Sequence, residues 1–578
     1  MKYSELLQFF KRQWAILLVL IVALAFFFFT SSFNFLSQDK HFVKWLSPDE
    51  TANYTVAKIY AETGSLQFFE KYNLIADDLI HPRSFRSDWG WVKPVSFLGV
   101  PLAYGFIARF FGSAVLPYLS PFFGALGILL FYLLIKELFG KKNALVSSLL
   151  LAVFPVYTYF SARSFFHNIF FIVATIGGLY FAVLMGKKKI AHDGKSYLKR
   201  EWKELLFALA SGLCFGWAIS ARSSELLWLG PLLVGLYLFN FRRLGLIKPW
   251  VFAYGMLIAL FPLLYWNQTL YGIWYASGYP ELNSSLATLS ENGSALAQKA
   301  ATGNLFSLQP LLAKIKMTIF HFGYKPEHSR AMFHAYVYAM FPWLIWLATA
   351  GVALFIAQAK KYERKRWLFL IGWVCVSAVL ILYYGSWVFY DNPDPKSFTI
   401  GNSYTRYWLP LYLGALPFVS LCVLTLASFF KRQRFSIPLV TAAVVCIATI
   451  SISFVWNDPS EGLAASLAKQ RSAKIELNEV VKRTENNAVI ITRYHDKLLF
   501  LQRKVVIGLF NDKNMIAIYA RIAQYVPLYY YNFSYSDKDL EYLNNGPLQE
   551  AGLRMEAISA ITDRFTLYRL NVVKADMK

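Results

Sequence analysis

Eleven long apolar runs constrain this chain more than any other feature of its sequence. About 20 consecutive apolar residues form a helix long enough to cross the hydrocarbon core of a bilayer. Hydrophobic residues make up 57% of the chain, whereas about 45–50% is usual for a soluble domain. The sequence therefore predicts a polytopic α-helical membrane protein. The predicted spans are 14–33, 115–135, 144–160, 165–186, 204–221, 225–241, 249–266, 334–357, 367–385, 407–430 and 437–456.

Basic residues indicate which ends of these spans share a side of the membrane. The formal net charge is +24, and Lys and Arg gather in short links between the apolar runs. Cytoplasmic links of membrane proteins are enriched in Lys and Arg, so this charge indicates orientation and argues against a nucleic-acid partner. The links predicted to be cytoplasmic are 11–12, 136–142, 187–189, 242–243, 360–366 and 431–434.

One further apolar segment, 95–111, contains Pro101 and Arg109 and is followed at once by Gly112. If it crossed the membrane, every later basic link would lie outside, against the usual charge bias. We therefore predict a helix that lies in or dips into the outer interface. The result is an integral protein of the plasma (inner) membrane with about eleven crossings. The parts predicted to lie outside are 34–94, 267–333, 386–406 and the C-terminal tail.

The tail after residue 456 has a different composition from the rest of the chain. It mixes charged residues with short β-rich runs at 488–492, 498–507 and 565–573, and one helix is predicted at 515–524. Its length of about 120 residues is a normal domain size. The sequence therefore predicts a transmembrane domain at 1–456 and a small extracytoplasmic α/β domain at 457–578.

An acidic pair follows the first span. Ser47, with Glu50 three residues later, has the pattern of a capping box, and the helix it begins is predicted to run over 49–63 and end at Gly64. Helix capping alone would explain both Asp49 and Glu50. Two carboxylates at the surface of a membrane domain also suit proton transfer, so both are candidate catalytic residues.

Several cations lie at the predicted outer ends of the spans. Each could hold a lipid-linked phosphate, and each could equally anchor its helix among the lipid headgroups. Acidic residues nearby at positions 77, 78 and 88 are expected to form a solvated surface. The candidate substrate-binding residues are Lys93, Arg163, Arg222, Lys325, Arg330, Arg406 and Tyr407.

No metal site is predicted. His321, Glu327 and His328 lie within eight residues, but this spacing matches no established zinc pattern. All 4 cysteines lie inside apolar runs, where neither a disulfide framework nor a CxxC site is available. A cluster of cations that face a phosphate is favoured over a metal site in this segment. We expect no cofactor; a bound divalent cation stays an open alternative but is not indicated.

Several short motifs follow one another in a fixed order along the chain. The first outer loop contains Ser47-Pro-Asp-Glu50 and Ala61-Glu-Thr-Gly64. Lys93-Pro94 then leads into an apolar helix that ends in Phe111-Gly112, and Arg406-Tyr-Trp-Leu-Pro410 opens one of the last spans. In this order the motifs resemble the GT-C membrane glycosyltransferases, and most closely the branch of protein O-mannosyltransferases and lipid A aminoarabinose transferases. The resemblance covers roughly 1–460, and a soluble outer C-terminal domain also occurs in parts of this superfamily.

The resemblance implies an inverting glycosyltransferase that takes a sugar from a polyprenyl-phosphate donor. The acceptor would be a glycan, a lipid or a protein at the outer face of the membrane. Asp49 would act as general base on the acceptor, and Glu50 would position the acceptor or cap its helix. Charge on the leaving phosphate would be stabilised by Lys93 and by one or more of Arg163, Arg222 and Arg406.

The sequence departs from that branch at one place. Many relatives carry an acidic residue a few positions after an arginine at the outer end of an early span. Here His167 and Asn168 follow Arg163, and neither is a carboxylate. The way in which an acceptor is held is therefore left open.

Three other functions fit parts of the sequence. An oligosaccharyltransferase-like enzyme needs a divalent cation, and 267–333 contains no second acidic metal motif. A transporter or flippase of lipid-linked glycans tends to have paired halves and charges at mid-membrane, whereas the charges here gather at the outer face. A non-catalytic membrane protein could display 457–578 as a binding module.

Overall fold

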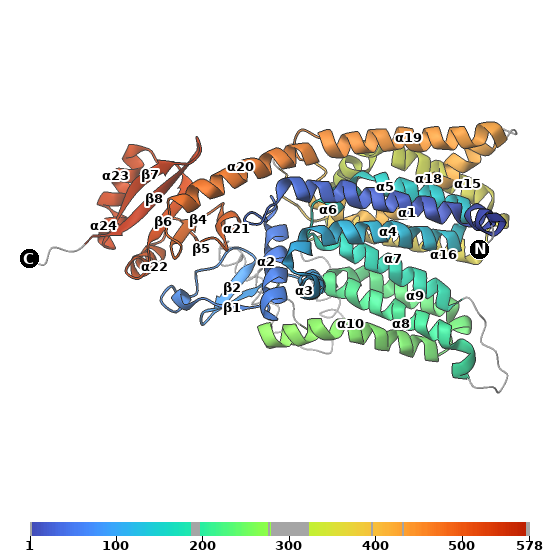
Figure 1. Cartoon of the computed structure of the whole chain (residues 1–578), viewed down its shortest axis with the longest axis horizontal. Coiled ribbons are helices and arrows are strands. Elements are labelled where there is room, and N and C mark those ends of the chain that lie inside the picture. Colours follow the sequence, from blue (N-terminus) through green and yellow to red (C-terminus); the bar gives the residue numbers. More distant parts are fainter. Residues whose placement is uncertain are drawn as a thin grey trace, which may run out of the picture.

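The computed structural model describes residues 3–186, 197–275, 278, 323–392, 394, 397–429 and 433–573. Within these ranges nine helices are long and apolar enough to cross a membrane, or up to 11 if each of two bent pairs is one span. The chain is thus a polytopic helical protein with a strand-containing C-terminal domain, as predicted. Figure 1 shows the helical bundle and this domain side by side, with the two chain termini at opposite ends.

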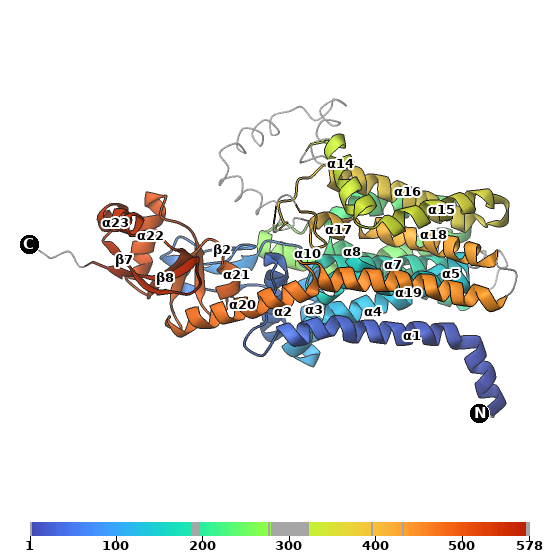
Figure 2. The same ribbon diagram turned by 90° about the horizontal axis from the view of Figure 1, so that it is seen from above.

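The helices of the bundle run side by side, and α19 (Gln433–Asn457) leads into α20 (Leu463–Lys482), which reaches the C-terminal domain (Figures 1 and 2). Short 3-10 turns precede or follow several of them: η2 (Ser113–Val115), η3 (Ser223–Glu225) and η5 (Ala359–Lys361). The unbroken long helices are α1 (Tyr3–Ser37), α4 (Leu116–Phe139), α7 (His167–Met185), α8 (Tyr197–Ala221), α9 (Leu226–Leu244), α10 (Ile247–Tyr271), α16 (Arg364–Gly385), α18 (Leu409–Ser428) and α19 (Gln433–Asn457).

Two predicted spans, 144–160 and 334–357, are each a bent pair of helices rather than one continuous helix. A proline follows each break, and the residue before a proline is disfavoured in the helical conformation. Phe154 and Phe341 accordingly adopt ψ angles of 123° and 60°. The bends are 53° and 93°. The parts are α5 (Lys141–Val153) and α6 (Pro155–Ala162), then α14 (Pro326–Phe333), the π-helical η4 (His334–Ala339) and α15 (Pro342–Ala357).

Basic links from different parts of the sequence meet at one end of the bundle. Arg366 donates a hydrogen bond from Nε to the carbonyl of Leu138 at 2.8 Å, which joins the start of α16 to the end of α4. Arg364 donates to the carbonyl of Phe239 near the end of α9, at 2.9 Å. The C-terminal domain lies at the opposite end (Figure 1). This arrangement fits the prediction that the basic links lie on one side of the membrane.

The segment predicted to lie at the interface forms α3 (Gly99–Phe111), which packs against α2 (Pro48–Thr63) and α8. At 1.5 Å per residue its 13 residues reach about 20 Å, which is less than the thickness of a bilayer core of about 30 Å. Phe106, Phe110 and Phe111 are exposed on one side. Gly99 lies so close to α8 that a Cβ there would stand 2.2 Å from the carbonyl carbon of Ser220.

The first outer loop forms α2 and a small antiparallel sheet. The capping box at Ser47 and the left-handed Gly64 (φ 74°) that ends α2 are both present, as predicted. Asp78 is not simply solvated, because its carboxylate accepts hydrogen bonds from Ser87 and from the backbone of Trp89 and Gly90. The elements are α2 (Pro48–Thr63), β1 (Phe68–Phe69), η1 (Lys71–Leu74), β2 (Phe85–Asp88) and β3 (Trp91–Pro94), with strand order β1-β3-β2.

The C-terminal domain has a five-stranded sheet in the order β5-β4-β6-β8-β7. β4 pairs in parallel with β5 and β6, and the other pairings are antiparallel. The predicted run 498–507 is a strand only in its second half, and β6 and β7 were not predicted. The elements are α20 (Leu463–Lys482), β4 (Val489–Thr492), α21 (Asp496–Leu499), β5 (Lys504–Ile507), α22 (Lys513–Ala523), β6 (Leu528–Phe533), α23 (Asp537–Asn545), α24 (Pro547–Glu550), β7 (Leu553–Ala560) and β8 (Phe565–Val572).

The C-terminal domain docks on the first outer loop. Val56 of α2 and Phe85 of β2 share one hydrophobic cluster with Leu477 and Leu499 of the C-terminal domain. Ile80 also forms a β-bridge with Val506 on β5. Because each part buries apolar surface of the other, the domain and the loop form one packed layer over the end of the bundle.

Reporter fusions test this arrangement. A reporter after Lys142 should score cytoplasmic and one after Val573 extracytoplasmic, because the basic links gather at the end of the bundle remote from the C-terminal domain. Paired reporters that are active on opposite sides of the membrane would measure both positions. A fusion after Lys142 that scores outside would contradict the non-crossing α3.

Candidate active site

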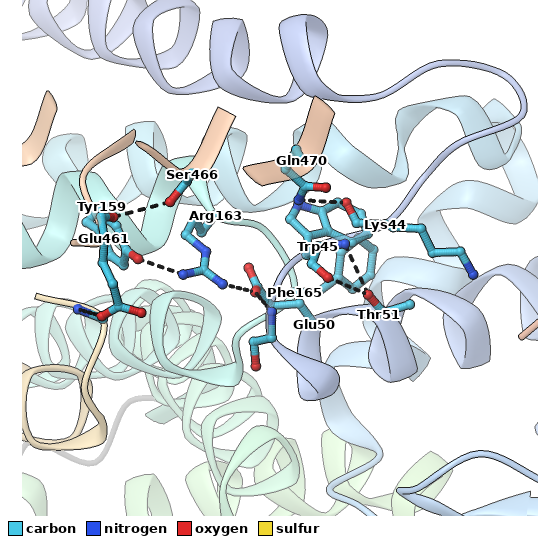
Figure 3. Close-up of polar contacts among 12 residues, drawn as sticks. Lys44, Trp45, Glu50, Thr51, Tyr159, Arg163, Phe165, Glu461, Ser466 and Gln470 are labelled. Atoms are coloured by element: carbon cyan, nitrogen blue, oxygen red, sulfur yellow. Dashed lines mark hydrogen bonds and ion pairs between the residues drawn. The ribbon is translucent and has the colours of Figure 1, made fainter. Parts of the chain in front are cut away.

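The N-terminus of α2 is fixed to the bundle by a buried ion pair. Glu50 is 0% exposed, and its Oε2 accepts a hydrogen bond from the backbone N–H of Ser47 at 3.1 Å. The same oxygen pairs with Arg163 at the end of α6, and Figure 3 shows the two side chains pointing toward each other. Burial raises the pKa of Glu50 to about 7, and the neighbouring guanidinium opposes that rise. Glu50 is therefore both a helix cap and a link between α2 and the bundle.

This pair accounts for the departure seen in the sequence. Arg163 has no carboxylate a few positions after it, but it receives one from Glu50, 113 residues earlier in the chain. A second nitrogen of Arg163 donates to the Tyr159 hydroxyl at 2.6 Å. His167 instead interacts through Nε2 with the carbonyl of Phe97 at 3.2 Å.

Asp49, the neighbour of Glu50, is in a different environment. Its side chain is half-buried, and it makes no hydrogen bond or ion pair with any residue that the structure describes. It acts electrostatically on Arg406, His167 and Lys497. Asp49 thus lies where the end of the bundle and the C-terminal domain face each other.

Arg406 lies on the short α17 (Ser403–Tyr407), just before α18. One terminal nitrogen donates to the hydroxyl of Ser403 at 2.7 Å. Its Nε is buried and has no hydrogen-bond partner among the described residues. Asn168 donates to the backbone carbonyl of Arg406 at 3.1 Å and so holds this turn. A buried guanidinium N–H without a partner is costly, which favours an anionic ligand here.

Arg222 is neutralised by a carboxylate of its own. Its Nε donates to Glu225 at 2.8 Å, and a terminal nitrogen donates to the Tyr384 hydroxyl at 3.1 Å. Its guanidinium lies 4.4 Å from the ring centre of Tyr407, and that of Arg406 lies 5.1 Å from the same ring. The ring of Tyr407 therefore lies near both predicted cations, Arg222 and Arg406. Arg222 already has an acidic partner in Glu225.

The other three predicted cations have no contact with Asp49 or Arg406 among the described residues. Lys93 is buried, with its Nζ 2.6 Å from Asp88 and 2.7 Å from the carbonyl of Leu270. Asp88 is thus a specific partner and not simply a solvated residue. Lys325, which directly precedes α14, and Arg330 on α14 are both exposed. Arg330 lines a cavity of about 880 Å³ that also includes Met332, Met340, Phe398 and Phe454.

The predicted histidine-rich segment lies only partly within the described residues. His321 lies outside them. His328 uses Nε2 for the Tyr404 hydroxyl at 2.9 Å and the carbonyl of Trp387 at 3.2 Å. Across the ranges that the structure describes, no group of three His, Cys, Asp or Glu side chains could hold a metal ion.

Sequence reasoning missed two lysines at the docking interface. Lys497 of α21 is buried, and its Nζ donates to the hydroxyl of Ser84 at 2.9 Å. Lys44 is also buried, and its Nζ donates to the carbonyls of Lys497 and Phe500 at 3.1 and 2.5 Å. Both are distant in sequence from their partners, and no local pattern marks either of them.

Comparisons with known proteins agree with the fold. Residues 100–266 match the family model described as dolichyl-phosphate-mannose-protein mannosyltransferase. An oligosaccharyltransferase structure from Archaeoglobus fulgidus, tethered to an acceptor peptide, matches with a TM-score of 0.52 and 13% identity, covering 97% of this chain and 74% of that one. ArnT from Cupriavidus metallidurans, bound to undecaprenyl phosphate, matches with a TM-score of 0.51 and 14% identity, covering 97% and 99%. No curated protein sequence matches.

These findings first define a class: the chain has the fold of the GT-C superfamily of membrane glycosyltransferases. The family model that matches residues 100–266 is that of protein mannosyltransferases, one of the groups that the motifs of this sequence resemble. The resemblance found in the sequence is thereby confirmed.

The buried pair can be tested by stability. Arg163→Met should lower the melting temperature of the purified protein markedly, because removing one partner of a buried ion pair costs about 3–5 kcal/mol. Lys58→Met is the matched control on α2, where Lys58 and Glu62 form an exposed pair at 3.9 Å. Exposed pairs contribute only about 0–1 kcal/mol. Equal melting temperatures for the two variants would contradict the structural role of Glu50 and Arg163.

Proposed function

We propose that this protein is an inverting glycosyltransferase that moves a sugar from a polyprenyl-phosphate donor to a glycan, lipid or protein acceptor. The observation that carries the proposal is that two charged side chains at the end of the bundle lack ion-pair partners among the residues that the structure describes. Asp49 has no hydrogen-bonded partner, and Arg406 has a buried Nε without one, within the described residues. An acid–base group and an anion-binding group at the same end of the bundle suit group transfer from a phosphate.

In this mechanism the acceptor is a hydroxyl or amine that gives its proton to Asp49. The acceptor atom bonds to the anomeric carbon as the bond from that carbon to the phosphate oxygen breaks. The electron pair leaves on the phosphate oxygen, and polyprenyl phosphate is released. Attack from the side opposite the phosphate inverts the anomeric centre.

Arg406 is the arginine best suited to the leaving phosphate. Arg163 and Arg222 each already have a buried glutamate partner, Glu50 and Glu225. Their positive charge is therefore largely compensated before a substrate arrives. A guanidinium offers several donors in a fixed plane, which matches phosphate oxygens.

The comparisons support a lipid-phosphate donor. The family model that matches is described by a dolichyl-phosphate sugar, and one of the similar structures is bound to undecaprenyl phosphate. Another carries a tethered acceptor peptide. A site at the end of a helical bundle, remote from the basic links, suits a donor whose lipid chain stays in the bilayer while its sugar reaches the outer face.

Release of free polyprenyl phosphate tests the function. Purified protein would be given a panel of polyprenyl-phosphate sugars with a membrane extract as acceptor source. Asp49→Asn should lower turnover about 10²–10⁴-fold, the usual contribution of a general base. Asp77→Asn is the matched control in the same loop, because Asp77 is exposed and pairs only with Arg521 among the described residues. Equal turnover in wild type and Asp49→Asn would remove Asp49 from the chemistry.

Substitution of the cations tests which one holds the phosphate. Arg406→Gln should lower kcat by about 10²–10³-fold, as does the loss of one donor to a developing negative charge. Arg471→Gln, on the exposed face of α20, is the control. A larger loss in Lys93→Met than in Arg406→Gln would assign the phosphate to Lys93 instead.

A further inference from the structure

The guanidinium of Arg406 is held by the hydroxyl of Ser403, three residues earlier on α17. One terminal nitrogen donates to Ser403 Oγ at 2.7 Å, and this is the only hydrogen bond of the Arg406 side chain to a described residue. Two rings lie beside the guanidinium, whose central carbon is 4.7 Å from the ring centre of Phe166 and 5.1 Å from that of Tyr407. The rings limit where the guanidinium can lie, and the hydrogen bond fixes which nitrogen points to Ser403.

Ser403 is held in turn by Asp391, which lies 12 residues earlier in the loop between α16 and α17. The backbone N–H and the hydroxyl of Ser403 both donate to Oδ2 of Asp391, at 2.9 and 2.5 Å. The other carboxylate oxygen accepts a hydrogen bond from the side-chain amide of Asn402 at 2.6 Å. Both oxygens of Asp391 are therefore used to hold the start of α17, where Ser403 and Asn402 are buried.

The hydrogen bonds at the Ser403 hydroxyl can run in only one direction. An ionised carboxylate only accepts, a guanidinium only donates, and a hydroxyl has one proton and two lone pairs. The proton of Ser403 therefore points to Asp391, and a lone pair faces Arg406. Without the carboxylate, the hydroxyl is free to turn its proton toward the guanidinium, where two donors would oppose each other. Asp391 thus makes Ser403 an acceptor for Arg406.

The contact with Ser403 leaves most donors of Arg406 available. Its Nε is buried without a partner, and its second terminal nitrogen makes no hydrogen bond to a described residue. The five N–H groups of a guanidinium lie in one rigid plane. Fixing one nitrogen between two rings therefore sets the directions in which the remaining N–H groups point.

We propose that Asp391 is a positioning residue that, through the Ser403 hydroxyl, holds Arg406 in the orientation that receives the donor phosphate. The inference rests on the proposed function, in which Arg406 stabilises the leaving phosphate. Within the described residues no hydrogen bond or ion pair joins Asp391 to Arg406 directly, so Ser403 carries the effect.

A purely structural role for Asp391 is the alternative. The backbone N–H of Ser403 is one of the donors that the start of a helix leaves unpaired, so Asp391 also caps α17. Ser403→Ala separates the two roles, because it removes the hydroxyl and keeps the backbone N–H that bonds to Asp391. Asp391→Ala removes the cap and the positioning contact together.

Binding of polyprenyl phosphate, the proposed product, tests the inference without turnover. By titration calorimetry in detergent, Ser403→Ala and Asp391→Ala should each weaken binding on the order of 10-fold, because the phosphate then meets a misoriented guanidinium. Asp512→Ala is the matched control, since Asp512 caps α22 by accepting from the backbone N–H of Asn514 at 2.8 Å. Wild-type affinity in Ser403→Ala would overturn the proposal.

Double variants separate positioning from folding. If Ser403 and Asp391 act through Arg406, neither Ser403→Ala nor Asp391→Ala should weaken the residual binding of Arg406→Gln any further. A residue that only supports the fold would cost the same with and without Arg406. Equal losses in the two backgrounds would therefore contradict a positioning role.

The same titrations distinguish failure of the inference from failure of the proposed function. Weaker binding in Arg406→Gln together with unchanged binding in Ser403→Ala would keep Arg406 as the phosphate ligand and reject the positioning role. Wild-type protein that binds no polyprenyl phosphate, or binds it equally well after Arg406→Gln, would reject the phosphate role of Arg406 and the inference with it. Ser403→Ala keeps the helix cap, so it decides the matter if Asp391→Ala fails to fold.

Discussion

The buried ion pair between Glu50 and Arg163 fixes the geometry on which the candidate site depends. Consecutive residues of a helix point about 100° apart, so Asp49 and Glu50 cannot share one environment. Glu50 points into the bundle, where it caps α2 and neutralises Arg163. Asp49 is thereby left at the surface between the bundle and the C-terminal domain. One carboxylate of the acidic pair thus determines where the other lies, which explains why both occur together without having the same chemical role.

The C-terminal domain is part of this arrangement and not a separate appendage. α2 lies across the end of the bundle, with the domain packed on its other side (Figure 1). Hydrophobic residues of both parts form one cluster, and polar contacts from Arg83 and from the buried Lys44 fix α21 within it. A buried lysine that is satisfied by carbonyls of another domain requires that domain to be docked. Undocking would expose this apolar surface and break these contacts together, so the domain and the first loop are stable as one packed layer.

Hydropathy and charge predicted the fold well because both are properties of contiguous sequence. The spans, the short α3, the capping box of α2 and the α/β character of the tail all follow from local patterns. The sequence shows a proline at each bend, Pro155 and Pro342. Because the residues on both sides of each break are apolar, hydropathy alone predicts one continuous span at each place. The site was predicted only in part. Asp49 and Arg406 came from local motifs, whereas the partners of Arg163 and the position of Lys497 depend on contacts across 113 and more than 400 residues. No local pattern encodes such pairs.

Counting cations at the outer face overestimates the positive charge that a substrate would meet. A guanidinium in a dry site is stable only when a carboxylate compensates its lost hydration, and Arg163 and Arg222 each have one. Lys93 is compensated in the same way by Asp88. Arg406 differs, because it forms no ion pair with a described residue and its buried Nε has no hydrogen-bond partner among those residues. Charges that the fold leaves uncompensated are the ones that a charged substrate can use, since binding then supplies the missing partner. By this criterion the part of the candidate site that a charged substrate can use is the region around Asp49 and Arg406, which form no ion pair with a described residue.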